Sequence, residues 1–341
     1  MRILVGFSGG LDSMMTAALL LDAGHTVEGA VVQMHTHTDT AGAKDAAATL
    51  GIPLHEIDAT ATFTREVIDN FVAEYKAART PNPCVRCNRF VKIGALADFA
   101  TRNGFDGFAT GHYARIVRHN GRFASARAKD AKKDQSYMLW QLSQEMLAAF
   151  HTPLADYDKE TLRAMARARG FAVADKPESQ DICFLPDGGY ADFIAARAGE
   201  SPCGNFVLTD GTVVGKHRGL LHYTVGQRKG LGIALGEPMF VTALRADTNE
   251  VVLAPAGQAK TQVFSVSDCV WSGITATDVS APHACFVALR YHAPLLPAVV
   301  QSVGDTVTIT LDEPTTRAVT PGQSAVCYNA DGMVLFGGLI L

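Results

Sequence analysis

The first half of the chain alternates short apolar runs with helical patterns. The apolar runs are typical of strands buried on both faces, and they occupy residues 3–7, 26–34, 52–57 and 105–110. Helical patterns lie at residues 12–22, 41–50, 61–78 and 88–103, with a loop over residues 80–87. Because such alternation gives a parallel sheet with helices on both faces, this half predicts an α/β fold with a doubly wound parallel sheet.

Residues 135–150 carry a longer helical pattern. Leu139, Leu142, Met146 and Phe150 fall on one stripe at helical spacing. An apolar stripe of this kind packs a helix against a core. The pattern therefore predicts one amphipathic helix over the whole segment.

Strand patterns replace helical ones after about residue 200. Asp210-Gly211 and Asp331-Gly332 separate β-type runs, as tight hairpin turns do. Val307, Ile309 and Leu311 alternate with threonines, which predicts a half-buried strand. We predict three domains: the α/β domain over residues 1–203, a small β-rich domain over residues 204–261 and a C-terminal β-barrel over residues 262–341.

Composition places this fold in an ordinary globular protein. Of 341 residues, 48% are hydrophobic and 19% are charged. Gly9-Gly10 ends the first apolar run, and no stretch approaches the roughly 18 apolar residues of a membrane helix. We therefore expect a cytoplasmic protein without membrane contact. Its seven cysteines are then expected to be reduced thiols.

Positive charge is concentrated in two segments, although the net charge is −4. Residues 115–133 contain seven basic residues and one acid, Asp130, and residues 216–229 contain four basic residues and no acid. Local basic stripes hold phosphates even on a protein of negative net charge. Charge by itself leaves two interpretations open, solvated loops or contact with a nucleic acid.

A glycine-rich loop, Ser8-Gly9-Gly10-Leu11-Asp12-Ser13, follows the first strand and opens the first helix. The glycines let a phosphate approach the backbone, and free N–H groups at the helix start attract an anion. The loop lacks both the Walker lysine and the G-x-G-x-x-G spacing of dinucleotide sites. It resembles the PP-loop of ATP pyrophosphatases, in which ATP adenylates an oxygen and releases pyrophosphate. The alternative is a plain tight turn.

Two cysteine-containing segments have polar, turn-like sequences, at residues 80–88 and 178–184. We expect Cys87 at the start of the helix predicted from residue 88, beside Arg86 and Arg89. Both features lower the pKa of a thiol. Three other cysteines lie in β-type runs, where small core residues are expected: Cys269, Cys285 and Cys327.

The pair Cys84-x-x-Cys87 is compatible with several chemistries. A zinc site would need a second pair of ligands, and a thioredoxin-like pair would follow a first βα turn instead of a proline-rich loop. Cys84, Cys87 and Cys183 as ligands of a [4Fe-4S] cluster are an alternative. Purely structural cysteines are another, and these residues leave both open.

Seven motifs spread over nearly the whole chain allow a comparison with known families. They lie at residues 6–13, 80–88, 110–115, 133–137, 178–184, 222–232 and 320–323. In this order they resemble the bacterial tRNA-specific 2-thiouridylase (MnmA) family. The resemblance implies an enzyme that makes 2-thiouridine at wobble uridine 34 of tRNA, using ATP and Mg²⁺. It also implies a persulfide donor or relay protein and tRNAs for lysine, glutamate and glutamine as substrates, with no role for DNA.

The same resemblance implies roles for individual residues. Cys183 would carry the persulfide and Cys87 would be its partner thiol. ATP binding falls on Gly6, Phe7, Ser8, Gly9, Gly10, Leu11, Asp12, Ser13, Met34 and Gly111. Contact with the tRNA and its target base falls on Asn82, Pro83, Cys84, His112, Lys133, Asp134, Gln135, Arg290, Tyr291 and Gln323.

The implied reaction begins with adenylation of O2 of uridine 34 and release of pyrophosphate. The terminal sulfur on Cys183 attacks C2, and AMP leaves. Cys87 then helps to release the sulfur, which leaves a transient Cys87–Cys183 disulfide that a reductant resets. In a variant, Cys87 first releases hydrosulfide from Cys183, and hydrosulfide is the attacking species.

Cys84 departs from the commoner family pattern, which has aspartate there. A third thiol beside the expected pair favours the iron–sulfur alternative and permits a Cys84–Cys87 disulfide in oxidised samples. Two rival functions also stay open. Another PP-loop enzyme, such as tRNA lysidine synthetase or a GMP-synthetase-like amidotransferase, would not need two remote cysteines. A nucleotide-dependent RNA-binding protein without catalysis would release no pyrophosphate.

Overall fold

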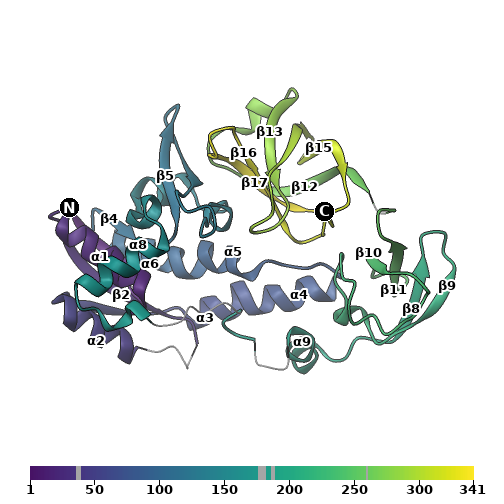
Figure 1. The fold of residues 1–341 in the computed structure, drawn as a ribbon, viewed down its shortest axis with the longest axis horizontal. Coiled ribbons are helices and arrows are strands. Elements are labelled where there is room, and N and C mark those ends of the chain that lie inside the picture. The colour runs from purple at the N-terminus through teal and green to yellow at the C-terminus, as the bar shows by residue number, and fades with distance from the viewer. Residues whose placement is uncertain (36–39, 176–181, 186–188, 259) are drawn as a thin grey trace.

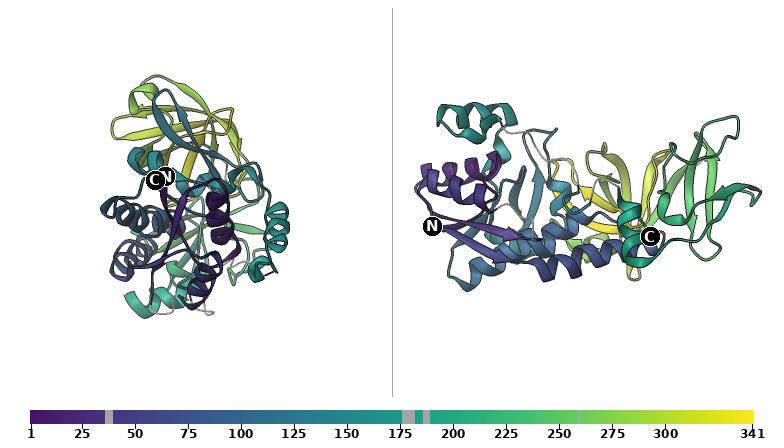
Figure 2. Two further views of the ribbon diagram at one scale, coloured as in Figure 1. Left: turned by 90° about the vertical axis from the view of Figure 1, so that its left-hand side faces the viewer. Right: turned by 90° about the horizontal axis from the view of Figure 1, so that it is seen from below.

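The computed structural model describes residues 1–35, 40–175, 182–185, 189–258 and 260–341. An α/β body with the N-terminus lies at one end of the molecule, and a β-barrel and a smaller β-sheet lie at the other (Figure 1). Helices from residues 60–102 run along one side between the two ends, as the further views also show (Figure 2). Two of the candidate thiols, Cys84 and Cys87, lie on this row of helices.

A parallel sheet of order β3-β2-β1-β4-β7 forms the centre of the α/β body. Its strands are β1 (Arg2–Gly6), β2 (Thr26–Gln33), β3 (Leu54–Asp58), β4 (Gly107–Ala109) and β7 (Phe150–His151). In β1, Ile3 and Val5 pack with α1 (Leu11–Asp22), α2 (Ala41–Leu50) and α8 (Lys159–Ala168). Leu4 faces the other way and packs with α6 (Ile93–Arg102). The predicted doubly wound α/β fold is confirmed.

The row of helices is more continuous than the sequence pattern predicted. The predicted helix at residues 61–78 consists of α3 (Thr60–Phe63), a π-helical turn (Thr64–Asp69) and α4 (Asn70–Lys76). The predicted loop contains a further helix, α5 (Pro83–Cys87), which a second π-helical turn (Asn88–Lys92) joins to α6. Asn82 starts α5, because its Oδ1 accepts a hydrogen bond from the backbone of Val85 at 3.4 Å. Cys87 therefore lies inside a helical run, and the prediction that it starts a helix was wrong.

Residues 135–150 do not form the single helix that their apolar stripe predicted. A 3₁₀ turn (Ser136–Leu139), α7 (Gln144–Ala149) and β7 divide the segment. The indole N–H of Trp140 donates to Ser324 Oγ of the barrel at 2.9 Å, so a long-range hydrogen bond holds the first half of the segment against the barrel. Ser143 starts α7 anew by accepting a hydrogen bond from the backbone of Met146 at 3.3 Å.

A hairpin of β5 (Ala114–His119) and β6 (Arg122–Arg127) carries much of the first basic segment. The hairpin contacts the barrel through its backbone. Ala126 forms a β-bridge with Met333, and the N–H of Arg127 donates to the carbonyl of Gly332 at 2.9 Å. The α/β body and the barrel are thus joined by backbone hydrogen bonding as well as by side chains.

Beyond residue 188, the described residues form strands, two short 3₁₀ turns and one α-helix, α9 (Tyr190–Ala198). The smaller sheet has the order β10-β11-β8-β9, with β8 (Gly204–Leu208), β9 (Val213–His217), β10 (Met239–Arg245) and β11 (Glu250–Pro255). Six strands close the barrel: β12 (Thr261–Trp271), β13 (His283–Ala288), β14 (Leu296–Val303), β15 (Thr306–Thr315), β16 (Ser324–Tyr328) and β17 (Val334–Ile340). Gly211 and Gly332, with φ of 90° and 76°, lie in the two predicted hairpin turns.

The cysteines agree with the compositional expectation of reduced thiols. All seven cysteines are free, and Cys285 and Cys327 are buried in the barrel as predicted. None of the helices in the described ranges is both long and apolar enough to span a bilayer.

The cap at Ser143 makes a testable prediction about the divided segment. Ser143→Ala removes the acceptor for the Met146 N–H and should lower the free energy of unfolding by about 1 kcal/mol. Ser143→Asp keeps an acceptor and should match the wild type. Urea titration followed by circular dichroism compares the three proteins. Equal midpoints for the Ala and Asp variants would show that the cap does not stabilise α7.

Candidate nucleotide and thiol site

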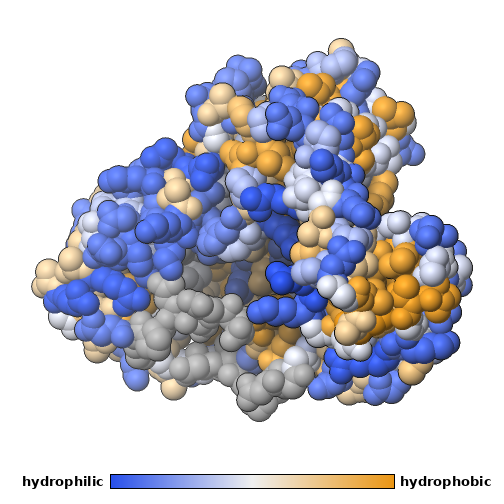
Figure 3. Space-filling view, turned by 45° about the vertical axis from the view of Figure 1, so that its right-hand side comes forward, coloured by the Kyte–Doolittle hydropathy of each residue, from blue (hydrophilic) through white to orange (hydrophobic). Residues whose placement is uncertain are grey.

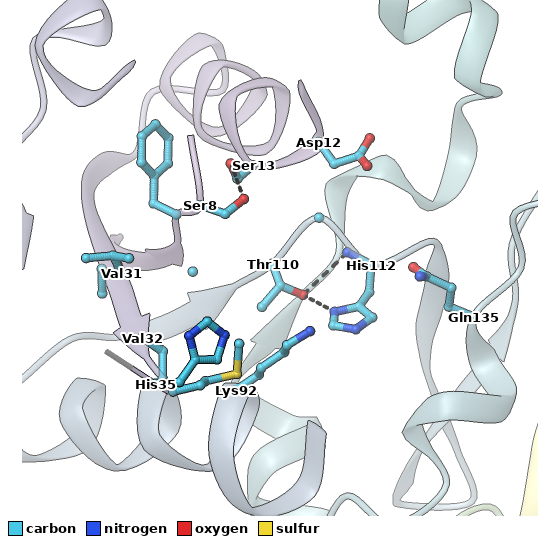
Figure 4. Close-up of a pocket in the computed structure, with 15 residues that line it drawn as sticks. Ser8, Asp12, Ser13, Val31, Val32, His35, Lys92, Thr110, His112 and Gln135 are labelled. Carbon is cyan, nitrogen blue, oxygen red and sulfur yellow. Dashed lines mark hydrogen bonds between the residues drawn. The ribbon is translucent and has the colours of Figure 1, made fainter. Parts of the chain in front are cut away.

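A pocket of about 490 Å³ opens at the carboxyl ends of β1, β2 and β4 (Figure 4). Ligands of open α/β sheets bind at this edge, and small-molecule sites commonly have this volume. The pocket gathers most of the residues that the resemblance assigned to ATP, together with two assigned to tRNA: Gly6, Phe7, Ser8, Asp12, Ser13, Met34 and Gly111, with His112 and Gln135.

The glycine-rich loop has the backbone that an anion site needs. Gly9 has φ of 73°, and a Cβ there would lie 2.6 Å from the carbonyl oxygen of Gly42, so only glycine fits. Gly10 is the N-cap of α1 and has no side chain to cap it. The leading N–H groups of α1 therefore receive no capping oxygen from that position. Ser13 Oγ donates to the carbonyl of Gly10 at 3.0 Å, which stabilises the turn.

Asp12 is held away from the loop serines by a cation and a phenol. Its carboxylate accepts hydrogen bonds from Lys159 Nζ at 2.7 and 2.9 Å and from Tyr113 OH at 2.7 Å. In Figure 4 the carboxylate points away from Ser8 and Ser13. Lys159 is 9% exposed, whereas the Asp12 side chain is 36% exposed, so water partly screens this ion pair. The negative charge of Asp12 is thus offset beside the place where phosphates would bind.

Gly111 has a packing role beside Asp12. A Cβ at Gly111 would lie 2.7 Å from Asp12 Cβ. A larger residue would therefore push the first turn of α1 out of place. Gly111 lines the pocket because the segment after β4 passes directly against the start of α1.

His112 is uncharged at neutral pH. Burial, together with the nearby charge of Lys92, lowers the pKa of His112 to about 3. Its Nδ1 lies 2.6 Å from Thr110 Oγ1, which fixes the ring at the rim of the pocket. His112 can therefore offer hydrogen bonds to a base or a ribose, but it brings no positive charge.

Cys87 lies against the pocket, and its environment differs from the expectation. Its thiol is 3.7 Å from Met34 Sδ, and Met34 lines the pocket. Burial raises the pKa of Cys87 to about 12, and Lys92 opposes this rise only in part. The predicted lowering of this pKa was wrong for two reasons. Cys87 ends α5 instead of starting a helix, and Arg86 is engaged by Glu66 at 2.7 Å.

Cys183 is brought to the same region from a distant part of the chain. Phe184 beside it packs at ring-centroid distances of 5.7 Å from Phe63 and 5.3 Å from Phe71. Phe184 also joins the apolar cluster that contains Cys87. Desolvation raises the pKa of Cys84 and Cys87, and the thiol of Cys183 adds to the rise. The three thiols thus lie within electrostatic reach of one another, with Cys183 and Cys84 exposed. Residues 178–181 of this motif lie outside the described residues.

The three thiols are not arranged as a metal site among the residues that the structure describes. In that part of the chain, no three His, Cys, Asp or Glu side chains, Cys84, Cys87 and Cys183 included, are grouped as metal ligands. The iron–sulfur alternative therefore stays a prediction.

The residues expected to contact tRNA lie in several places. Gln323 Nε2 donates to the carbonyls of Thr80 at 2.8 Å and Pro81 at 3.2 Å, so the barrel holds the segment that leads to Asn82, Pro83 and Cys84. A second pocket, of about 430 Å³, lies between the hairpin side and the barrel. Asp134, Arg290 and Tyr291 line it, together with Arg127 and Lys132.

Several of these residues also have structural partners. Gln135 Oε1 accepts a hydrogen bond from the N–H of Tyr113 at 2.9 Å. Arg290 Nη2 donates to Thr320 Oγ1 at 2.7 Å. Asp134 accepts hydrogen bonds from Ser136 and from the N–H of Ala128. Their positions are therefore fixed before any RNA binds.

Sequence reasoning missed four polar residues of this site. Lys92 and Thr110 line the first pocket, and Lys159 and Tyr113 hold Asp12. Thr110 and Tyr113 lie near His112 in the motif at residues 110–115, where the resemblance implied a role only for Gly111 and His112. Lys92 and Lys159 gave no signal, because each looks like an ordinary surface lysine of a helix.

Models of known protein families match almost the whole chain. Three family models match consecutive parts of the chain: the tRNA methyl transferase HUP domain over residues 1–187, the tRNA methyl transferase PRC-barrel domain over residues 191–255 and the Aminomethyltransferase beta-barrel domain over residues 261–340.

Curated relatives match over their full lengths. The tRNA-specific 2-thiouridylase MnmA of Carboxydothermus hydrogenoformans is 42% identical, covering 99% of this chain and 97% of that protein. Those of Chloroflexus aurantiacus and Lachnoclostridium phytofermentans are 43% and 40% identical, covering 99% and 100% of this chain and 98% and 99% of those proteins. On this similarity, the chain belongs to the tRNA-specific 2-thiouridylase MnmA family.

Proposed function

We propose that this protein is a tRNA sulfurtransferase that uses ATP to activate O2 of wobble uridine 34 and replaces that oxygen with sulfur. The observation that carries the proposal is the contact between Cys87 and Met34. One residue of the phosphate-loop pocket touches a thiol of the helical row at 3.7 Å. An oxygen activated by ATP and a reactive thiol would therefore lie close together at this site. A thiolation reaction requires this arrangement, whereas simple ATP hydrolysis does not.

ATP would bind with its phosphates at the loop from Gly6 to Ser13. The walls near Val31, Val32 and Met34 are apolar and suit the adenine ring. Mg²⁺, when bound with the phosphates, would offset their charge. Gly111 keeps the start of α1 in place, and Lys159 keeps Asp12 from repelling the phosphates.

The chemical steps conserve atoms and electrons. O2 of uridine 34 attacks the α-phosphorus of ATP, forms an O–P bond and releases pyrophosphate. The terminal sulfur of a persulfide on Cys183 attacks C2, and AMP leaves with O2. The thiolate of Cys87 attacks the inner sulfur of Cys183, and the cleaved S–S bond leaves its electron pair on the new thiouridine sulfur. The resulting Cys87–Cys183 disulfide is reset by a thiol reductant. Hydrosulfide released from Cys183 by Cys87 is the alternative attacking species.

The tRNA would lie across the α/β body and the C-terminal barrel. We assign ATP binding and thiol chemistry to residues 1–203, a β-rich spacer to residues 204–261 and tRNA contact to residues 262–341. Figure 3 shows a hollow with hydrophilic walls on one face of the molecule. Asn82, His112 and Gln135 would meet the target base, and Lys133, Arg290 and Tyr291 the neighbouring nucleotides. The tRNAs for lysine, glutamate and glutamine are the proposed substrates, and a persulfide protein is the proposed donor.

Nucleoside mass spectrometry tests the reaction. Unmodified tRNA is incubated with protein, ATP, Mg²⁺ and a persulfide donor, and its nucleosides are analysed. We expect ATP-dependent 2-thiouridine from the wild type, none from Cys87→Ser or Cys183→Ser, and normal yield from Cys203→Ser, which removes another exposed thiol. Methylation without sulfur, or no product from anaerobically prepared protein with or without a reconstituted cluster, would overturn the proposal.

Replacement of Cys84 separates persulfide from cluster chemistry. Cys84→Asp introduces the commoner family residue at an exposed position. We expect 2-thiouridine yield comparable to the wild type, because the proposed persulfide route uses only Cys87 and Cys183. Loss of product in Cys84→Asp, with Cys203→Ser still active, would instead favour a route that needs three thiolates.

The burial of Cys87 predicts a steep pH dependence of its reactivity. With its pKa raised to about 12, Cys87 is almost entirely protonated at neutral pH. Its alkylation by iodoacetamide should therefore rise about tenfold per pH unit between pH 7 and 10, with no plateau, because the thiolate is the nucleophile. Peptide mass spectrometry after timed quenching measures this rate. A plateau below about pH 9 would contradict the assigned environment of Cys87.

A further inference from the structure

The second π-helical turn controls which way Lys92 faces. In a π-helix the hydrogen bonds join each residue to the fifth one along, and the N–H of Ile93 bonds to the carbonyl of Asn88 in this way. Gly94 permits the turn, because a Cβ there would lie 2.6 Å from the carbonyl oxygen of Arg89. Residues five apart share a face in such a turn, so Lys92 lies on the side of Cys87. Single π turns inside helices are frequent at functional sites.

Lys92 extends from this turn into the nucleotide pocket. Figure 4 shows its ammonium group lying toward Thr110 and His112, across the pocket from the phosphate loop. Of the described residues that line the pocket, Lys92 is the one lysine or arginine. No ion pair involving Lys92 is found among the described residues, although the side chain is exposed within the open pocket.

Two other basic side chains described near the pocket, Lys159 and His112, bring no available positive charge to it. Lys159 holds the Asp12 carboxylate at 2.7 and 2.9 Å. His112 is neutral at physiological pH, partly because Lys92 itself disfavours its protonation. The loop has no Walker lysine. Among the described lysines and arginines that line the pocket, a phosphate would therefore meet the ammonium of Lys92 alone.

We propose that Lys92 is a catalytic residue whose ammonium binds the α-phosphate while uridine 34 is adenylated and while AMP departs. The inference rests on the proposed function and adds a residue to it. The loop N–H groups would hold the β- and γ-phosphates, which leave as pyrophosphate. The α-phosphate stays between loop and thiols, where negative charge develops on it when C2 is attacked. A fixed ammonium at that point stabilises the transition state more than the ground state.

Binding of AMP and of adenosine isolates this contact. Lys92→Met removes the charge and keeps the length of the side chain, and Lys92→Arg keeps a charge. We expect Lys92→Met to weaken AMP binding at least about tenfold, as loss of a charge-assisted hydrogen bond does. Adenosine binding should be unchanged, and Lys92→Arg should recover part of the AMP affinity. Isothermal titration calorimetry measures all three proteins. Lys76→Met is the matched control, because Lys76 is an exposed lysine of the same row of helices that does not line the pocket.

Turnover distinguishes a failure of this inference from a failure of the proposed function. Pyrophosphate release and 2-thiouridine formation at saturating ATP should fall about a hundredfold in Lys92→Met. If the wild type makes 2-thiouridine and Lys92→Met binds AMP and turns over equally well, the role of Lys92 is wrong and the function stands. If the wild type makes no 2-thiouridine but AMP binding depends on Lys92, the phosphate contact stands and the function falls.

Gly94→Ala tests the turn without removing the charge. The added methyl group collides with the Arg89 carbonyl and should rotate Lys92 away from the pocket. AMP affinity should then fall as in Lys92→Met, while circular dichroism and thermal midpoint report whether the helices persist. Unchanged AMP affinity in a folded Gly94→Ala protein would overturn the link between the π turn and Lys92.

Discussion

The site depends on how the charge of Asp12 is offset. A loop that binds phosphate through backbone N–H groups gains nothing from a carboxylate in its first helical turn unless that carboxylate is neutralised. Lys159 and Tyr113 do this from two other parts of the chain, through hydrogen bonds of 2.7–2.9 Å. Lys159 is buried, whereas the Asp12 side chain is 36% exposed. The ion pair and the hydrogen bond from Tyr113 tie α8 and the segment after β4 to the phosphate loop, beside the pocket.

Local patterns were enough to predict the fold, and long-range contacts account for what they missed. The period-two and helical patterns gave the α/β body, the hairpin turns at Gly211 and Gly332 and the buried barrel strand of Val307, Ile309 and Leu311. They failed at residues 135–150, where the bond from Trp140 to Ser324 joins residues 184 apart in sequence. The loop residues of the pocket could be predicted because they form a sequence motif. Lys159 and Lys92 could not be predicted, because only the folded structure shows that Lys159 contacts Asp12 and that Lys92 faces the pocket.

The two thiols that are proposed to react, Cys183 and Cys87, differ in their exposure to solvent, and this difference suits them to different steps. Cys183 is exposed, as the proposed transfer of sulfur from another protein would require. Cys87 is buried against Met34 and is kept protonated by that burial. In the proposed reaction, a resolving thiol that reacted freely would discharge the persulfide before the base was activated. The raised pKa of Cys87 would slow that attack, so burial would help to order the proposed steps.

The barrel is hydrogen-bonded to the segment that leads to Cys84 and Cys87. Gln323 holds the carbonyls of Thr80 and Pro81, and the N–H of Thr80 donates to the carbonyl of Pro321 at 2.8 Å. Asn82, two residues on, caps the helix that ends at Cys87. An RNA that binds the barrel near Gln323 would thus act on the start of α5 through three residues. In the proposed reaction these bonds would couple RNA binding at the barrel to the thiols, and the barrel, which begins at Thr261, would act as part of the active site.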